Sequence, residues 1–189
     1  WTPDVYEGAP TSITALFAIV PKIAAMAVII RLLFEPFGAF TDEWMQIIIP
    51  LSVLSMAVGA FAALAQNNMK RLLAYSSIGN MGYALIGVAA ASQLGITSVV
   101  IFLFIYVAMT IGVFAVLLCM RRGGIAAEKI EDFSGLSQTN PGLAYTMAIL
   151  MFSMSGIPPM AGFFGKFFVF QAAVDSNLYA LAIFGVVTS

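Results

Sequence analysis

Residues 142–174 read GLAYTMAILMFSMSGIPPMAGFFGKFFVFQAAV, and this stretch indicates the class of protein. It overlaps a run of 33 residues, 133–165, that contains no charged side chain. As one straight helix this run would be about 50 Å long, whereas the hydrocarbon core of a membrane is about 30 Å thick. Pro158 and Pro159 interrupt the run, because a proline removes a backbone donor and clashes with the carbonyl four residues earlier. The stretch therefore predicts a membrane helix that is broken around Ser155–Pro159.

The rest of the chain contains further segments long and apolar enough to cross a bilayer, for which about 20 residues are needed. The expected spans are 11–34, 45–66, 72–93, 97–120, 142–174 and, in part, 177–189. They predict an all-α fold, a polytopic transmembrane helix bundle. The chain begins with Trp and ends inside an apolar run, so we interpret residues 1–189 as a single membrane domain fragment of a longer protein.

The composition excludes several classes of function. Hydrophobic residues make up 61% of the chain and charged residues only 9%, whereas a soluble domain has roughly a quarter charged residues. A net charge of -1 without a basic run gives nucleic acid nothing to bind. With no histidine and one cysteine, Cys119, the chain lacks the usual ligands of a haem or an iron–sulfur cluster. We expect no metal and no redox cofactor on this chain.

The basic residues predict how the helices are oriented. Lys70 and Arg71 lie between the second and third spans, and Arg121, Arg122 and Lys129 lie between the fourth and fifth. By the positive-inside rule both loops belong on the cytoplasmic side. The N-terminal segment then falls on that side too. Lys70 is interpreted first as an orientation anchor, with a place in a proton path as the alternative.

Two lysines lie within apolar segments. Lys22 is at the middle of the first span, where a charge is costly and therefore faces the bundle interior or water. Lys166 follows the helix break. A buried lysine can exchange a proton, because burial favours its neutral form and a nearby carboxylate favours its charged form. We predict that both lysines transfer protons; the alternatives are a fixed structural cation for Lys22 and an interfacial lysine for Lys166. Every carboxylate falls in a loop or at a span end, so neither lysine has an evident counter-ion.

Polar side chains recur at helical spacing in the third and fourth spans. Ser76, Asn80 and Tyr83 share one helical face, as do Tyr106 and Thr110. These residues fit hydrogen bonding between helices. They equally fit a hydrated proton path, and the two interpretations are compatible.

Four motifs, in this order, resemble the N-type antiporter-like membrane subunits of respiratory complex I, an NADH:quinone oxidoreductase. The motifs are WTPDVYEGAPT at 1–11, Pro21-Lys22, NMKRLLAYSSI at 68–78, and GIPP at 156–159 followed by GFFGKF at 162–167. The resemblance covers essentially the whole chain. It implies a fragment of a 14-helix subunit with two inverted half-channels, in which this chain supplies helices 8 to 12 and the start of 13.

By this resemblance, Lys22 corresponds to the central lysine of helix 8 and Lys166 to the lysine of the broken helix 12. The family's glutamate of helix 5 and lysine of helix 7 would precede Trp1. The resemblance further implies proton pumping while other subunits bind NADH, FMN, iron–sulfur clusters and quinone. The implied partners are the antiporter-like M and K subunits and the lipid bilayer of an energy-transducing membrane, either the bacterial or the mitochondrial inner membrane.

The N type is favoured over the M type by the segment Asp4–Pro10 and by Lys166, where the M type has a glutamate. Asn80 departs from the family, since many relatives have a histidine at that place, and an amide cannot titrate. The alternative within the same superfamily is a subunit of a monovalent cation/proton antiporter or of a membrane-bound hydrogenase.

Overall fold

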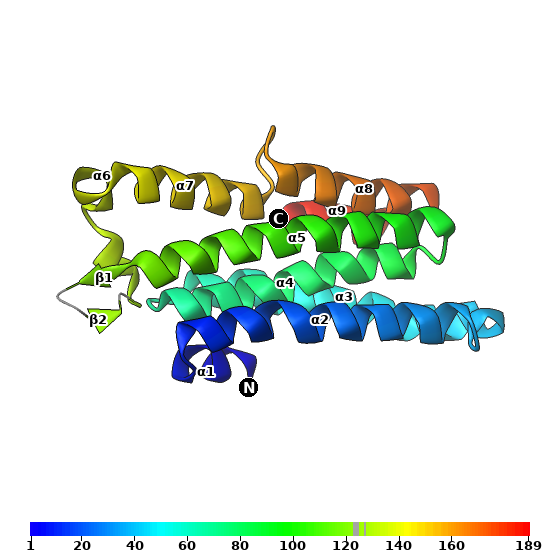
Figure 1. Cartoon of the computed structure of the whole chain (residues 1–189). Helices are drawn as coiled ribbons and strands as arrows, with labels where there is room; N and C mark the ends of the chain where they lie inside the picture. Colours follow the sequence, from blue (N-terminus) through cyan, green and yellow to red (C-terminus); the bar gives the residue numbers. More distant parts are fainter. Residues whose placement is uncertain (123–124, 127) are drawn as a thin grey trace.

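The computed structural model describes residues 1–122, 125–126 and 128–189, and the side chains of 1–120 and 128–189. Its helices run back and forth along one axis and form an elongated bundle (Figure 1). In chain order the elements are α1 (Thr2–Gly8), α2 (Thr11–Phe34), η1 (Gly38–Phe40), α3 (Thr41–Leu64), α4 (Met69–Ala89), α5 (Gln93–Cys119), β1 (Arg121–Arg122), β2 (Ile125–Ala126), η2 (Ile130–Phe133), α6 (Leu136–Thr139), α7 (Pro141–Ser155), α8 (Ala161–Asp175) and α9 (Tyr179–Thr188).

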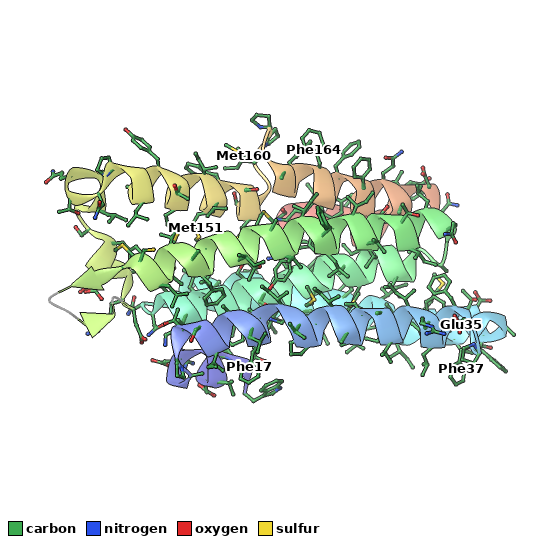
Figure 2. All side chains as sticks on the ribbon, viewed as in Figure 1. Phe17, Glu35, Phe37, Met151, Met160 and Phe164 are labelled. Carbon is green, nitrogen blue, oxygen red and sulfur yellow. The ribbon has the colours of Figure 1, made fainter. Side chains whose placement is uncertain are left out.

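The predicted all-α membrane fold is confirmed. Four helical segments are long and apolar enough to cross a membrane: Thr11–Phe34, Gly38–Leu64, Met69–Ala89 and Gln93–Cys119. The only strands in the described part of the chain, β1 and β2, form a short antiparallel pair outside the bundle. Apolar side chains project from the outer surface, as Phe17 and Phe164 do on opposite sides of Figure 2. An apolar exterior of this kind suits contact with lipid or with other membrane helices.

Helix α4 lies at the centre of the bundle and packs closely against α3. A Cβ atom added to Gly59 of α3 would lie 2.5 Å from the backbone nitrogen of Gly79 of α4. The two backbones can approach this closely because Gly59 lacks a side chain, whereas a Cβ at Gly79 would lie at an ordinary contact distance of 3.7 Å from Gly59. Helix α5 covers α4 on another side, and Phe102 and Val99 of α5 are almost fully buried there.

The predicted break in the last long segment is present. Helix α7 ends at Ser155, and Gly156 adopts a left-handed conformation with φ 85°, which a glycine accepts without strain. Helix α8 begins at Ala161, after Pro158 and Pro159. Figure 1 shows α7 and α8 following one another along the same side of the bundle, with the connecting loop projecting between them. Each half has 15 residues, about 22 Å, so neither half alone is long enough to span the bilayer.

Several helices begin three or four residues before the predicted boundary. Helix α4 starts at Met69 because the Asn68 side chain accepts hydrogen bonds from the backbone nitrogens of the next turn. Helix α5 starts at Gln93 because Ser92 caps it through Gly95. Hydropathy alone does not register these polar caps.

The loops that carry the basic residues lie at one end of the bundle, together with α1 (Figure 1). The basic loops thus share one side, and that this side faces the cytoplasm stays a prediction. Arg121 and Arg122 contribute their backbone to β1, and their side chains lie outside the described residues.

Candidate functional site

Lys22 projects from the middle of α2 toward α1. Its Nζ atom donates a hydrogen bond to the Tyr6 hydroxyl and another to the Ala18 carbonyl oxygen, 3.2 Å away. Nζ also lies 4.9 Å from the centroid of the Tyr6 ring, a cation–π contact. Among the ion pairs of the described residues, none involves Lys22. The ammonium group is therefore held by neutral oxygens and an aromatic ring.

Lys166 is buried, with 6% of its surface exposed, and its Nζ atom reaches back across the helix break. It donates hydrogen bonds to the carbonyl oxygen of Ser155, at 3.1 Å, and to the Ser189 hydroxyl, at 2.7 Å. The Ser155 carbonyl is free to accept because α7 ends there, and the last carbonyls of a helix have no partner within it. Nζ lies 4.6 Å from the centroid of the Tyr83 ring. In the described residues, Lys166 too lacks a carboxylate partner.

A cavity of about 410 Å³ lies beside Lys166. Ser76, Asn80 and Tyr83 of α4 all line it, so the predicted polar face does point into one space. The Asn80 side-chain amide donates hydrogen bonds to Ser76, to the carbonyl oxygen at 2.9 Å and to the hydroxyl at 3.3 Å. A volume of this size holds several waters.

Tyr106 and Thr110 of α5 belong to a different group of polar residues. The Tyr106 hydroxyl donates to the Ser77 hydroxyl, 3.1 Å away, and lies 3.5 Å from the Ala18 carbonyl oxygen. The Thr110 hydroxyl is buried beside Tyr106. Both residues line a second cavity, of about 10 Å³, together with Tyr6. This volume is near the minimum that accommodates one water.

The two cavities meet at a single side chain. Met154, the penultimate residue of α7, lines both the large cavity beside Lys166 and the small cavity beside Tyr6. Two consecutive residues of α4 face different cavities. Ser76 lines the large cavity, and Ser77 accepts a hydrogen bond from Tyr106, which lines the small one. The polar residues therefore form two groups, one for each lysine, separated by an apolar thioether.

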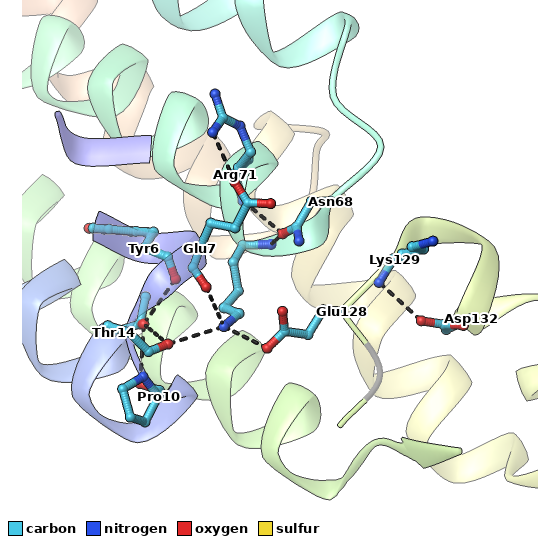
Figure 3. A network of polar contacts seen from close by, with 11 residues as sticks. Tyr6, Glu7, Pro10, Thr14, Asn68, Arg71, Glu128, Lys129 and Asp132 are labelled. Atoms are coloured by element: carbon cyan, nitrogen blue, oxygen red, sulfur yellow. Dashed lines mark hydrogen bonds and ion pairs between the residues drawn. The ribbon is translucent and has the colours of Figure 1, made fainter. Parts of the chain in front are cut away.

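Lys70 does not line either cavity. It is 3% exposed, and its Nζ atom pairs with Glu128 at 2.6 Å and donates to the carbonyl oxygens of Glu7 and Ala9 (Figure 3). These three acceptors match the three donors of an ammonium group. Lys70 is therefore more than an exposed orientation anchor: it is a buried cation that fastens α1 and the loop at 128 to the start of α4. Its predicted place in a proton path stays a prediction.

Arg71, next to Lys70, also binds α1. One of its terminal nitrogens lies 2.7 Å from Asp4 and 2.9 Å from Glu7. Sequence reasoning had assigned Asp4 and Glu7 to a loop and gave them no partner. It also missed Tyr6 and Ser77. Tyr6 lies in a segment taken for a loop, and Ser77 lies beside the polar face of its helix, so neither belongs to a helical repeat of polar residues. In the described part of the chain, no group of three or more acidic, cysteine or histidine side chains could hold a metal.

Comparison with known proteins adds independent information. The profile of the family described as "NADH:quinone oxidoreductase/Mrp antiporter, TM" matches residues 1–189. Curated relatives include NADH-quinone oxidoreductase subunit N of Rhodospirillum rubrum, 56% identical over 189 residues, and that of Methylobacterium nodulans, 58% identical. Each alignment covers 100% of this chain and 39% of the relative. The chain thus spans about two fifths of the length of these relatives.

Solved structures share the fold. A chain of respiratory complex I from Thermus thermophilus, determined with bound aureothin, superposes with a TM-score of 0.83 at 34% identity, covering 100% of this chain and 40% of that one. A chain of the Mrp complex from Dietzia sp. superposes with a TM-score of 0.90 at 26% identity, covering 100% and 35%. The predicted resemblance to N-type antiporter-like subunits is confirmed by these relatives.

Proposed function

Because the chain belongs to the NADH:quinone oxidoreductase/Mrp antiporter membrane family, we propose that it is part of the proton-translocating subunit N of an NADH:quinone oxidoreductase, complex I. In this proposal Lys22 and Lys166 take up and release protons while electrons pass from NADH to quinone elsewhere in the complex. We further propose that this chain carries no redox centre and that NADH, FMN, the iron–sulfur clusters and quinone bind to other subunits.

One observation carries the proposal: two lysines within the bundle are held by neutral groups only, in the part of the chain that the structure describes. Lys22 binds a phenol and a carbonyl, and Lys166 binds a carbonyl and a hydroxyl. A fixed ion pair would favour the charged form of each lysine strongly, and neutral partners favour it less. A carboxylate that moves toward either lysine would then favour its charged form, and one that moves away would favour release of the proton.

The polar groups between the lysines suit proton transfer. Hydroxyls both accept and donate hydrogen bonds, so Tyr106, Ser77 and Ser76 can relay a proton with the help of cavity water. Asn80 can hold water but cannot titrate. Tyr83 lines the large cavity, and Thr110 lines the small one.

The proposed partners follow from the family. They are the other membrane subunits of complex I, with the antiporter-like M and K subunits as neighbours, and the lipid bilayer. The curated relatives described above are bacterial. We therefore place the chain in a bacterial inner membrane, with several passes through it.

The test is the substitution Lys22→Met in the full-length subunit within the assembled complex, with NADH-driven proton uptake measured in membrane vesicles. We expect uptake to be lost while the complex still assembles, because methionine keeps the length of the side chain but cannot hold a proton. The matched control is Lys129→Met, since Lys129 is exposed in the loop after β2. Undiminished uptake in the Lys22→Met complex would contradict the proposal.

A subunit of a monovalent cation/proton antiporter is the second candidate. The observation in its favour is the close superposition on the Mrp complex chain, with a TM-score of 0.90. For this candidate, Lys22→Met would leave NADH oxidation and its linked proton uptake unchanged and would instead reduce the tolerance of the cells to sodium or potassium.

A further inference from the structure

Tyr6 is the only side chain, among those the structure describes, that hydrogen-bonds to Lys22. It belongs to α1, a short helix before the first membrane span, and is 2% exposed. Its ring packs edge-on against Phe114 of α5, with the centroids 6.5 Å apart. Nothing in the proposed function requires a residue of α1, yet this helix places a phenol on the central lysine.

The Tyr6 hydroxyl has neighbours on its other side as well. Tyr6 lines the small cavity that it shares with Tyr106 and Thr110. Burial raises the pKa of the Tyr6 hydroxyl, and the nearby Tyr106 raises it further, whereas a hydrogen bond with Ser77 lowers it. The hydroxyl therefore stays protonated and stands between Lys22 and the Ser77–Tyr106 pair.

Such a hydroxyl can pass a proton without keeping it. The phenol oxygen accepts a proton from the Lys22 ammonium while its own O–H proton leaves to a water in the small cavity or to Ser77. The receiving water or hydroxyl passes one of its own protons onward along its hydrogen bonds to a basic acceptor or to bulk water. Lys22 becomes neutral, Tyr6 ends neutral with its O–H bond restored, and one proton has moved.

The position of Tyr6 depends on contacts at the surface end of the bundle. Helix α1 has seven residues, too few to be stable alone. Arg71 pairs with Asp4 and Glu7, on either side of Tyr6 in the chain. Lys70 binds the carbonyl oxygens of Glu7 and Ala9, and the Thr14 hydroxyl donates to the Tyr6 carbonyl oxygen, 3.2 Å away (Figure 3). These bonds fix the backbone from which the phenol projects.

We propose that Tyr6 passes the proton between Lys22 and the small cavity, and that the ion pairs of Arg71 with α1 act as a latch that positions Tyr6 for this step. The inference rests on the proposed function, since it adds the residue through which Lys22 exchanges its proton. It also gives the WTPDVYEG segment a role in the transfer.

The first test is Tyr6→Phe in the full-length subunit within the assembled complex, which removes one oxygen and keeps the ring on Phe114. We expect the rate of NADH-driven proton uptake per assembled complex to fall roughly two- to tenfold, the factor by which the loss of one hydrogen bond changes an equilibrium constant. Tyr145→Phe is the matched control, because Tyr145 is 72% exposed on α7. Wild-type uptake in Tyr6→Phe, with uptake lost in Lys22→Met, would overturn the role of Tyr6 and leave the proposed function standing.

The second test asks whether Arg71 acts through Tyr6. Arg71→Gln should lower the rate of NADH-driven proton uptake per assembled complex, and Arg71→Lys should restore part of the loss. Adding Arg71→Gln to Tyr6→Phe should cause no further loss, because a positioning residue has no effect once the group that it positions is gone. If the two losses multiply instead, the latch does not act through Tyr6 and that part of the proposal fails.

Discussion

Lys166 donates a hydrogen bond over 3.1 Å to the carbonyl oxygen of Ser155, the last residue of α7. The break in the helix therefore supplies the acceptor for the lysine that follows it. Because this acceptor is a neutral dipole, it orients the ammonium group without fixing its charge. Loss of the proton would also weaken a bond that joins the two halves of the broken helix, because a neutral amine is a poorer donor than an ammonium group.

This relationship leads to a prediction for Lys166→Arg. Arginine keeps a positive charge and can still donate to Ser155, but it does not give up a proton in a protein. We expect the complex to assemble and NADH-driven proton uptake to fall at least tenfold. The measurement is uptake in vesicles, normalised to the amount of assembled complex. Normal uptake with arginine would show that this position needs only a fixed cation.

A second prediction concerns Lys70. Glu128→Gln leaves a buried ammonium without its countercharge, a change that costs about 3–5 kcal/mol in a fully buried pair. Because the Glu128 side chain is 36% exposed, we expect a smaller loss, about 1–3 kcal/mol. It would be seen as faster thermal inactivation of the complex, with the protons taken up per NADH unchanged. An intact thermal stability combined with reduced proton uptake would instead place Lys70 in the proton path.

A third prediction tests the close packing of α3 on α4. In Gly59→Ala the new methyl group would meet the backbone of Gly79 at 2.5 Å, and backbone cannot move aside as a flexible side chain can. Overpacking of this kind costs typically about 1–3 kcal/mol. We expect less assembled complex on a native gel. Gly38→Ala is the control, because a Cβ at Gly38 meets nothing within 4 Å and should leave assembly unchanged.

The fold was largely predictable from the sequence. Long apolar runs can satisfy their backbone groups within a membrane only as helices, so length and hydropathy are enough to find them. The Pro158–Pro159 pair marked the break for an equally direct reason. Helix starts were placed too late at α4 and α5, because the capping residues Asn68 and Ser92 are polar and lie before the apolar run.

The site was predictable only where a residue is costly in its surroundings. Lys22 and Lys166 could be singled out because a charged side chain in an apolar membrane segment is energetically costly and usually has a function. Tyr6 and Glu128 could not, because each lies outside the spans and meets its partner only when distant segments fold together. The contacts Tyr6–Lys22 and Glu128–Lys70 are properties of tertiary structure, with no period in the sequence to reveal them.

The thioether of Met154, which separates the two cavities, also exposes the protein to oxidative chemistry. Oxidation would turn this apolar group into a sulfoxide, a polar acceptor of hydrogen bonds. Water on either side could then bond to the same atom, and the two lysine groups would share one continuous hydrated space. If the chain works as proposed above, this oxidation would join the two lysine groups, and a methionine sulfoxide reductase would separate them again. Oxidation of Met154 would thus impair the proposed proton transfer without changing either lysine.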